Sequence, residues 1–206
     1  AAEVVFYELL TPFTPAGIDI KAALTATERA NLHTYGYGVK AFGLSMVEAA
    51  ITISQGQVPT EVLTQLLQLV RELLLAPVRL LEGVPEVLQE LAKSHRLILI
   101  TKGDLVHQTR KVTTSGLDHL FDHVEIVLEK DVATYAKVFR DISVRPERVC
   151  MVGNSVKSDI LPILELGGHA VHIPYQFLWE LERAEHPPIN PRFSELKNIN
   201  ELPAWI

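Results

Sequence analysis

The stretch VCMVGNSVKSDI (residues 149–160) decides how the rest of the chain is interpreted. Its apolar run VCMV is typical of a buried strand, and that run stops at Gly153. Asn154 follows directly, and Asp159 comes five positions after it. Amide and carboxylate oxygens are ligands that suit a hard cation such as Mg²⁺. The stretch therefore predicts part of a metal or phosphate site just beyond the end of a strand.

Strands and helices alternate through the second part of the chain. Short β-branched or apolar runs predict strands at 96–101, 123–128, 148–153 and 169–174, with a helical segment between each pair. This alternation predicts an α/β fold with a parallel, doubly wound sheet, in which ligands bind beyond the carboxyl ends of the strands. The Pro-rich tail, 176–206, is expected to be irregular and to pack over the sheet edge or near the helical segment.

The first part of the chain is predicted to be all helical. Apolar residues recur at spacings of three and four in AEVVFYELL, and TEVLTQLLQLVRELLL (60–75) is the clearest helix. The sequence YGYGVKAFG (35–43) predicts a glycine-rich break between helices. We therefore expect a helical domain over residues 1–80 and an α/β domain over residues 81–206.

Composition narrows the class of protein. The chain has 206 residues, of which 48% are hydrophobic and 21% charged, so it is expected to fold around a substantial core. A net charge of −6 without a basic stripe argues against nucleic-acid binding. No apolar stretch is long enough for a membrane span, and no secretory signal is visible. The single cysteine, Cys150, favours a reducing compartment, and we expect a cytoplasmic protein.

Polar residues follow the predicted strands and should converge at one edge of the sheet. Thr101 ends the first strand, Lys102 and Gly103 follow it, and Lys130 follows the second strand. A hydroxyl and a lysine can hold phosphate oxygens, while Asp159 and its neighbouring amide can hold a cation. Together they predict phosphoryl chemistry that works by electrostatic stabilisation.

Each of these residues also has a purely structural interpretation. Asp159, or its neighbour Ser158, can serve as the N-cap of the following helix. Lys102 and Lys137 can be surface lysines that face solvent, and Asp104 can cap the helix after the first strand. The prediction of a site therefore rests on the joint pattern.

The order of these motifs resembles the haloacid dehalogenase (HAD) superfamily. A helical segment precedes LILITKGD, LEK and MVGNSVKSDI, and this likeness covers nearly the whole chain. The resemblance implies a Rossmann-like core with a helical C1 cap over residues 1–80. It implies that Thr101 binds the transferring phosphoryl group and that Lys130 neutralises charge on the nucleophile and phosphate. By the same likeness, Asp159 and Asn154 would hold Mg²⁺.

The chain departs from the family pattern in two places. Asn154 stands where the fourth motif usually has an acid, so the predicted magnesium site loses one negative charge. The first motif, D-x-D-x-T, is absent, and the nearest match, VVFYELLTPF, would put Tyr7 and Leu9 at its two acidic positions. The helical period of that segment is the better match, and it resembles the first helix of the cap. We therefore expect the first core strand, with both aspartates, upstream of Ala1.

The predicted function is a Mg²⁺-dependent phosphatase that acts on a small phosphorylated metabolite through an aspartyl-phosphate intermediate. Tyr35, Tyr37 and Lys40, with Lys102 and Gly103, are the candidate substrate contacts. A metal-independent haloacid dehalogenase is one alternative, and a non-catalytic relative without the nucleophile is another. A monomer or a homodimer is expected, with no nucleic-acid or membrane partner.

Overall fold

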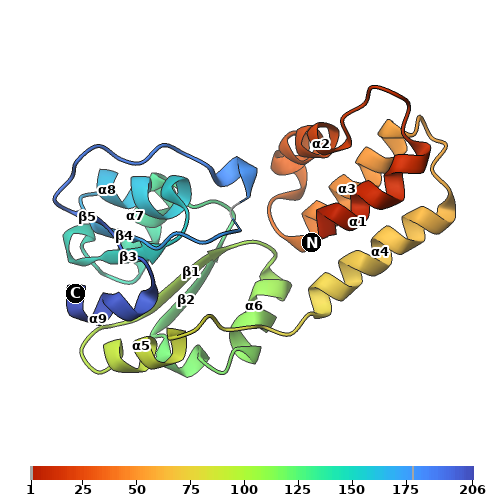
Figure 1. Ribbon diagram of the computed structural model, residues 1–206. Coiled ribbons are helices and arrows are strands. Elements are labelled where there is room, and N and C mark those ends of the chain that lie inside the picture. Colours follow the sequence, from red (N-terminus) through yellow and green to blue (C-terminus); the bar gives the residue numbers. More distant parts are fainter. Residues whose placement is uncertain (1, 178) are drawn as a thin grey trace. The chain divides into compact units, whose positions relative to one another are not determined.

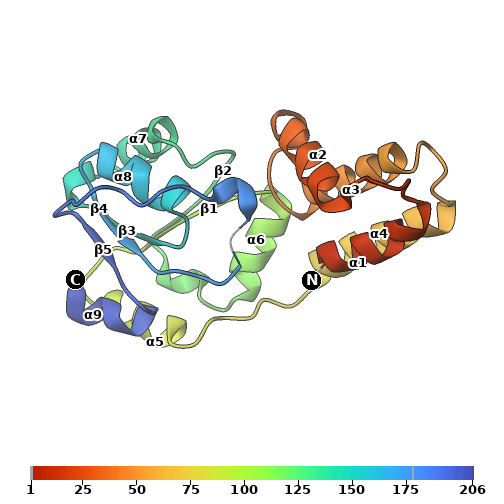
Figure 2. The ribbon, with the colours of Figure 1, turned by 45° about the horizontal axis from the view of Figure 1, so that its top comes forward.

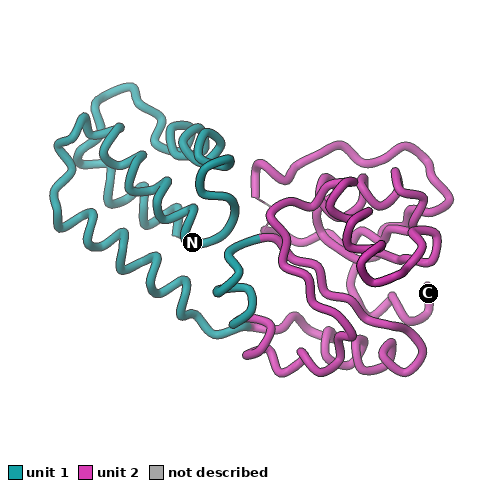
Figure 3. The backbone as a smooth tube through the Cα atoms, turned by 180° about the vertical axis from the view of Figure 1, so that it is seen from behind, with its two compact units in different colours: residues 1–78, 103–110 teal, residues 79–102, 111–206 magenta. Residues whose placement is uncertain are grey.

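The computed structural model describes residues 2–177 and 179–206 (Figure 1). The chain divides into two compact units, which Figure 3 shows in different colours. The first unit consists of the residues up to 78 together with 103–110, and the second of 79–102 together with 111–206. Each unit has its own hydrophobic clusters. The cap and core roles predicted for the two parts of the sequence remain predictions.

The first unit is built from helices packed around one core. Its helices are α1 (Ala2–Leu10), α2 (Ile20–Tyr35), α3 (Val39–Ile53) and α4 (Thr60–Leu75), and it also contains the start of α6 (Leu105–Thr114). Phe6, Leu10, Met46 and Leu66 are fully buried in this core. The all-helical prediction for this part of the sequence is confirmed.

Helix α1 also decides between the two interpretations of the segment VVFYELLTPF. Tyr7 and Leu9 lie within this helix and pack against the helical core, so they do not lie in a strand of a parallel sheet. The alternative that placed them at the acidic positions of the first HAD motif is therefore wrong. The helical period, which favoured a helix here, is confirmed.

The glycine-rich break predicted over 35–43 is shorter in the structure. Helix α2 runs to Tyr35 and α3 begins at Val39, so Lys40 lies in the first turn of α3 and not in a loop. Gly36 and Gly38 have φ values of 69° and 107°, which allows the chain to reverse within three residues. The break is shorter than the predicted range of 35–43 because the two glycines allow a tight turn.

The second unit contains parallel strands in two sheets. They are β1 (Ile98–Lys102), β2 (His123–Val127), β3 (Cys150–Gly153), β4 (His169–His172) and β5 (Phe193–Glu195). Strands β1 and β2 pair with each other, and β3, β4 and β5 form the second sheet with β4 in the middle. The predicted α/β class with parallel strands is confirmed. The tail is more regular than expected, because β5 pairs with β4 at the sheet edge.

Helices cover both faces of the strands in this unit. Helices α7 (Val132–Asp141) and α8 (Leu161–Glu165) lie on one face, and α5 (Val84–Leu91) and α9 (Leu202–Trp205) lie on the other (Figures 1 and 2). This layering is the doubly wound arrangement that the alternating sequence predicts. Among the helices that the structure describes, none combines the length and apolar content needed to cross a bilayer.

Strands β1 and β3 lie at neighbouring edges of the two sheets. Ile100 and Met151 belong to the hydrophobic cluster on one face, and Leu97 and Cys150 to the cluster on the other. Within the described residues, β1 pairs only with β2, and β3 pairs only with β4. Every residue of β1 and β3 is only half-buried, whereas the middle strand β4 is largely buried. Each of these two strands therefore has one edge without a partner strand among the described residues.

Candidate functional site

Lys130 and Asp159 meet at the carboxyl ends of β2 and β3. Lys130 lies three residues after β2, and Asp159 lies in a π-helical turn (Val156–Ile160) that follows β3. The Lys130 Nζ donates a hydrogen bond to Asp159 Oδ1 over 2.7 Å. The two side chains are only 14% and 7% exposed, so this is a largely buried ion pair. The sequence motifs predicted that these two residues would converge, and the structure brings them together.

Gly153 makes room for the Asp159 carboxylate. A Cβ atom at position 153 would lie 2.3 Å from Asp159 Oδ2 and 2.4 Å from its Cγ, well inside contact distance. Only a residue without a side chain lets the carboxylate lie against the end of β3. The backbone N–H of Ser155 donates to the same Oδ2 over 2.9 Å. This explains why the apolar strand must end in glycine.

The start of the helical segment after β3 differs from what the sequence suggested. Ser155 is its N-cap, because its Oγ accepts the backbone N–H of Ser158 over 3.1 Å. The interpretation of Ser158 or Asp159 as the N-cap is therefore wrong. Both residues instead lie inside the π-helical turn and are buried. π-Helical turns are often found at functional sites, because they redirect side chains that a regular helix would place elsewhere.

Lys102 is held at the centre of a polar network. Its Nζ donates to Glu129 over 3.0 Å, to Ser158 Oγ over 2.9 Å and to Glu182 over 2.6 Å. These three acceptors match the three N–H donors of an ammonium group. The side chain is only 11% exposed, so the alternative of a solvent-facing Lys102 is wrong. A surface position is confirmed for Lys137, which is exposed and pairs with Asp141.

Glu182 is a member of this network that the sequence did not reveal. It comes from the segment between β4 and β5, and its carboxylate accepts from Lys102, from Ser155 Oγ over 2.7 Å and from Ser158 Oγ. Burial raises the pKa of Glu182, but the hydrogen bonds from Lys102, Ser158 and Ser155 outweigh it, and the net pKa is lowered. A single acid in a Pro-rich tail carries no pattern that sequence reasoning could detect.

Tyr135, on α7, holds the same π-helical turn in place. Its hydroxyl donates to the backbone carbonyl of Ser158 over 3.0 Å, and its ring is fully buried. Burial, followed by the nearby carboxylates of Asp159 and Glu182, raises the pKa of Tyr135 well above its usual value. Tyr135 is therefore a neutral donor that fixes the π-helical turn.

Thr101 and Asn154 lie at the ends of β1 and β3. Thr101 is half-buried and pairs in register with Ile126 of β2. Asn154 directly follows β3, and its backbone carbonyl lies 3.2 Å from Nε2 of His172. Asn154, just after β3, and Asp159, in the π-helical turn that follows, each carry a hard oxygen donor. Their chemistry fits a magnesium ion.

The other candidate residues lie in the first unit. The Tyr35 hydroxyl donates to Glu48, and this hydrogen bond is the main reason that the pKa of Tyr35 is raised. Lys40 pairs with Asp104 over 3.0 Å. Tyr37 lies in the short turn between α2 and α3, and Gly103 follows β1 with a φ of 135°. The structure gives Tyr35 and Lys40 acidic partners within their own unit.

Asp104 has the structural role that the sequence suggested. Its Oδ1 accepts the backbone N–H of His107 over 2.9 Å, at the start of α6. This hydrogen bond, together with a smaller contribution from Lys40, lowers the pKa of Asp104. The prediction that Asp104 caps this helix is confirmed.

Comparison with known proteins agrees with this arrangement of motifs. The family model for haloacid dehalogenase-like hydrolases matches residues 10–167. The chain belongs to this family. A solved structure of a HAD-like family hydrolase from Xanthomonas campestris is 35% identical, with a TM-score of 0.88. That likeness covers 99% of this chain and 81% of the other, so the HAD-like fold extends over both units described here.

Two further relatives of this HAD-like hydrolase extend the comparison. A glyceraldehyde 3-phosphate phosphatase from Methanothermobacter thermautotrophicus is 33% identical over 97 residues. That match covers 45% of this chain and 42% of the phosphatase, so it spans less than half of either protein. The HAD-hydrolase YfnB of Bacillus subtilis, solved bound to magnesium, is 16% identical with a TM-score of 0.64, over 99% of this chain and 89% of that one. The likeness to YfnB shows a shared fold.

Proposed function

We propose that this protein is a Mg²⁺-dependent phosphatase that hydrolyses a small phosphomonoester. The observation that carries the proposal is the buried ion pair between Lys130 and Asp159 at the carboxyl ends of β2 and β3. Ligands of doubly wound sheets bind at this edge. A lysine paired with an acid there supplies one positive charge for a phosphate and one carboxylate for a metal.

In this proposal the phosphate is held by Thr101 and Lys130. The Lys130 ammonium can retain its bond to Asp159 and still direct its remaining N–H donors at a phosphate oxygen. Thr101, at the end of the neighbouring strand, offers a hydroxyl donor. Lys102 has all three donors engaged, so a substrate contact from it requires one of these bonds to be exchanged.

Asp159 and Asn154 are the proposed magnesium ligands. When bound, the metal neutralises charge on the phosphoryl group and orients it for attack. The chain itself holds the Asp159 carboxylate in place through Lys130 and the Ser155 N–H, before any ligand binds. Because Asn154 is neutral, we expect weaker magnesium affinity than a site with two acids would have.

The nucleophile is proposed to come from a further parallel strand that would lie between β1 and β3. Among the described residues, β1 and β3 each have one edge without a partner strand. Strand β3, and β1 together with the preceding Leu97, contribute side chains to the same two hydrophobic clusters. A parallel strand between β1 and β3 would join the two sheets and end beside Thr101 and Gly153. A D-x-D sequence at its end would supply the attacking carboxylate and the general acid–base group, giving an aspartyl-phosphate that water hydrolyses.

A small phosphorylated metabolite is the proposed substrate class. The partial match to glyceraldehyde 3-phosphate phosphatase makes a triose phosphate the first substrate to test. Tyr35, Tyr37, Lys40 and Gly103 remain the proposed substrate contacts of a helical C1 cap. The proposal places the protein in the cytoplasm, as a monomer or a homodimer.

An assay of the full-length protein on three substrates tests this proposal. We expect hydrolysis of para-nitrophenyl phosphate and glyceraldehyde 3-phosphate in the presence of Mg²⁺, loss of both activities with EDTA, and no chloride release from chloroacetate. The dehalogenase alternative is tested as well, because Asn154 adds no negative charge for a metal and that reaction needs no metal. Chloride release that persists in EDTA would establish a dehalogenase, and inactivity on all three substrates would favour the non-catalytic alternative.

A further inference from the structure

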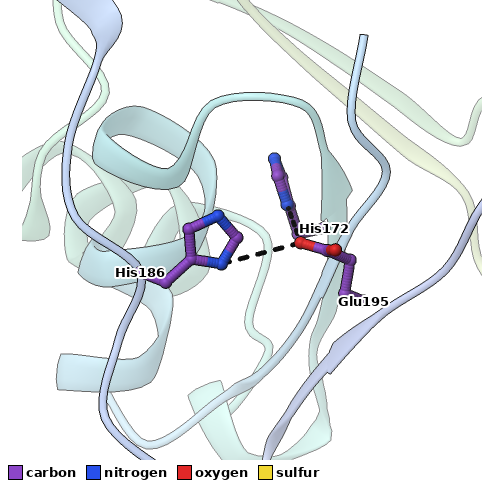
Figure 4. Close-up of side chains that lie close together, drawn as sticks. All are labelled: His172, His186 and Glu195. Carbon is purple, nitrogen blue, oxygen red and sulfur yellow. Dashed lines mark hydrogen bonds and ion pairs between the residues drawn. The ribbon is translucent and has the colours of Figure 1, made fainter.

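A second cluster of metal-ligating side chains lies at the ends of β4 and β5 (Figure 4). His172 is the last residue of β4, and Glu195 is its register partner at the end of β5. His186 comes from the irregular segment that precedes β5 and turns its ring toward the same carboxylate. One potential ligand atom from each of the three side chains lies within 4.8 Å of the other two. None of the three was singled out by a sequence motif.

The hydrogen bonds of His172 set the state of its two ring nitrogens. Its Nε2 lies 3.2 Å from the backbone carbonyl of Asn154, which can only accept, so Nε2 carries a hydrogen. Its Nδ1 lies 2.8 Å from Glu195 Oε2, another acceptor. A cation between Nδ1 and this carboxylate would be bound by both groups. A histidine whose other nitrogen donates to a backbone carbonyl is the usual arrangement of a metal ligand.

We propose that His172, His186 and Glu195 bind a divalent transition-metal ion, with Zn²⁺ the best match. The Nδ1 atoms of His172 and His186 lie 2.8 and 3.6 Å from the same Glu195 oxygen. Ligand atoms about 2.0–2.1 Å from a tetrahedral zinc lie roughly 3.3 Å apart, so small side-chain movements would complete the site. Two imidazoles and one carboxylate favour zinc, copper or nickel over magnesium.

Burial and position indicate what the metal would do. The His172 side chain is 8% exposed, whereas those of His186 and Glu195 are 56% and 45% exposed, so the metal would be reached from the surface. His186 lies four residues after Glu182, on the same irregular segment that inserts Glu182 into the Lys102 network. Bound zinc would therefore hold the segment between β4 and β5 against the ends of these two strands. This inference does not depend on the phosphatase activity.

Zinc binding to the full-length protein tests the inference. With Mg²⁺ in large excess, we expect one Zn²⁺ per chain by equilibrium dialysis, and at least about tenfold weaker binding in both His186→Ala and Glu195→Gln. Both substitutions are at exposed positions, so the variants should fold. We also expect zinc to slow tryptic cleavage at Arg183 and Arg192, which flank His186 in the sequence.

Two control variants make the result decisive. His123 and Glu125 form a similar pair, with Nε2 and Oε2 2.8 Å apart, and His123→Ala should leave zinc binding unchanged. Asp159→Asn should also leave zinc binding unchanged, because Asp159 belongs to the proposed magnesium site and not to the zinc site. Zinc binding that is absent, that is equal in all variants, or that is lost in Asp159→Asn and retained in His186→Ala would overturn the inference.

Discussion

At the scale of single residues, each oxygen of the Asp159 carboxylate has a defined set of neighbours. Its Oδ1 accepts from Lys130, and its Oδ2 lies against Gly153 and accepts the Ser155 N–H. The sequence predicted that Lys130 and Asp159 would meet, because both follow parallel strands. It did not predict Glu182 or Tyr135, because contacts from a distant tail or a buried helix leave no local spacing to detect.

Replacing Lys130 tests the proposed charge pairing. Lys130→Ala should lower kcat for phosphomonoester hydrolysis by about 100-fold or more, because a charge aimed at the transferring group is lost from a largely buried site. Steady-state kinetics of the full-length protein measure this effect. Lys137→Ala is the matched control, since Lys137 is exposed and pairs with its helical neighbour Asp141. Equal rates for both variants would remove Lys130 from the proposed mechanism.

Replacing Gly153 tests the space reserved for the carboxylate. Gly153→Ala should displace Asp159, because the new Cβ would lie 2.3 Å from Oδ2, and it should weaken magnesium-dependent activity. Gly43→Ala is the control, because its Cβ would lie 2.5 Å from a Val70 methyl within the helical unit. Both variants should lower the melting temperature, and only Gly153→Ala should raise the magnesium concentration needed for half-maximal activity. Unchanged magnesium dependence in Gly153→Ala would contradict this account of the glycine.

At the scale of elements, regular helices and strands were easier to predict than the segments that join them. Helix α4 occupies the predicted range, and the predicted strands lie within one or two residues of β1, β2, β3 and β4. The π-helical turn and strand β5 were missed. A π-helical turn has no sequence period of its own, and β5 has only three residues, too few for an alternating pattern.

The segment between β4 and β5 is expected to make the stability of the second unit depend on pH. The pKa of Glu182 is lowered in the folded protein, so its contribution to stability is fully present above the unfolded value of about 4.3 and is lost as pH falls toward the folded value. Glu182→Gln should lower the free energy of unfolding by about 1–3 kcal/mol at pH 7, because charge-assisted bonds to Lys102 are weakened.

Denaturant unfolding across pH measures this difference. The gap between the wild-type protein and Glu182→Gln should narrow as pH falls from 5 to 3. Glu180→Gln is the control, because Glu180 is exposed and pairs with Arg183 on the same segment. A constant gap between pH 3 and 7 would mean that the Glu182 charge does not stabilise the fold.

At the scale of the whole molecule, the two sheets of the second unit are the feature that bears most on function. The sequence alone predicted parallel strands and an additional first strand. The structure adds that β1 and β3 each pair with a single strand among the described residues, while β3, and β1 with the preceding Leu97, contribute to the same two clusters. Which side chains a helical cap would direct at the substrate was not predictable, because that depends on how the two units meet.

Hydrogen exchange tests the proposed additional strand. In the full-length protein, the amides of β1 and β3 that do not bond to β2 or β4 should exchange as slowly as those of the middle strand β4, because a new strand would pair with them. Exchange resolved to single residues measures this protection. Rapid exchange at these amides, beside protected amides in β4, would mean that the two edges stay unpaired.

The magnesium dependence of phosphomonoester hydrolysis tests the central claim most directly. Activity of the full-length protein should rise to saturation with added Mg²⁺ and disappear in EDTA. In Asp159→Asn the half-saturating Mg²⁺ concentration should rise at least about tenfold, because a charged oxygen ligand is lost. Hydrolysis that survives EDTA and is unchanged in Asp159→Asn would contradict a magnesium-dependent phosphatase built at the ends of β2 and β3.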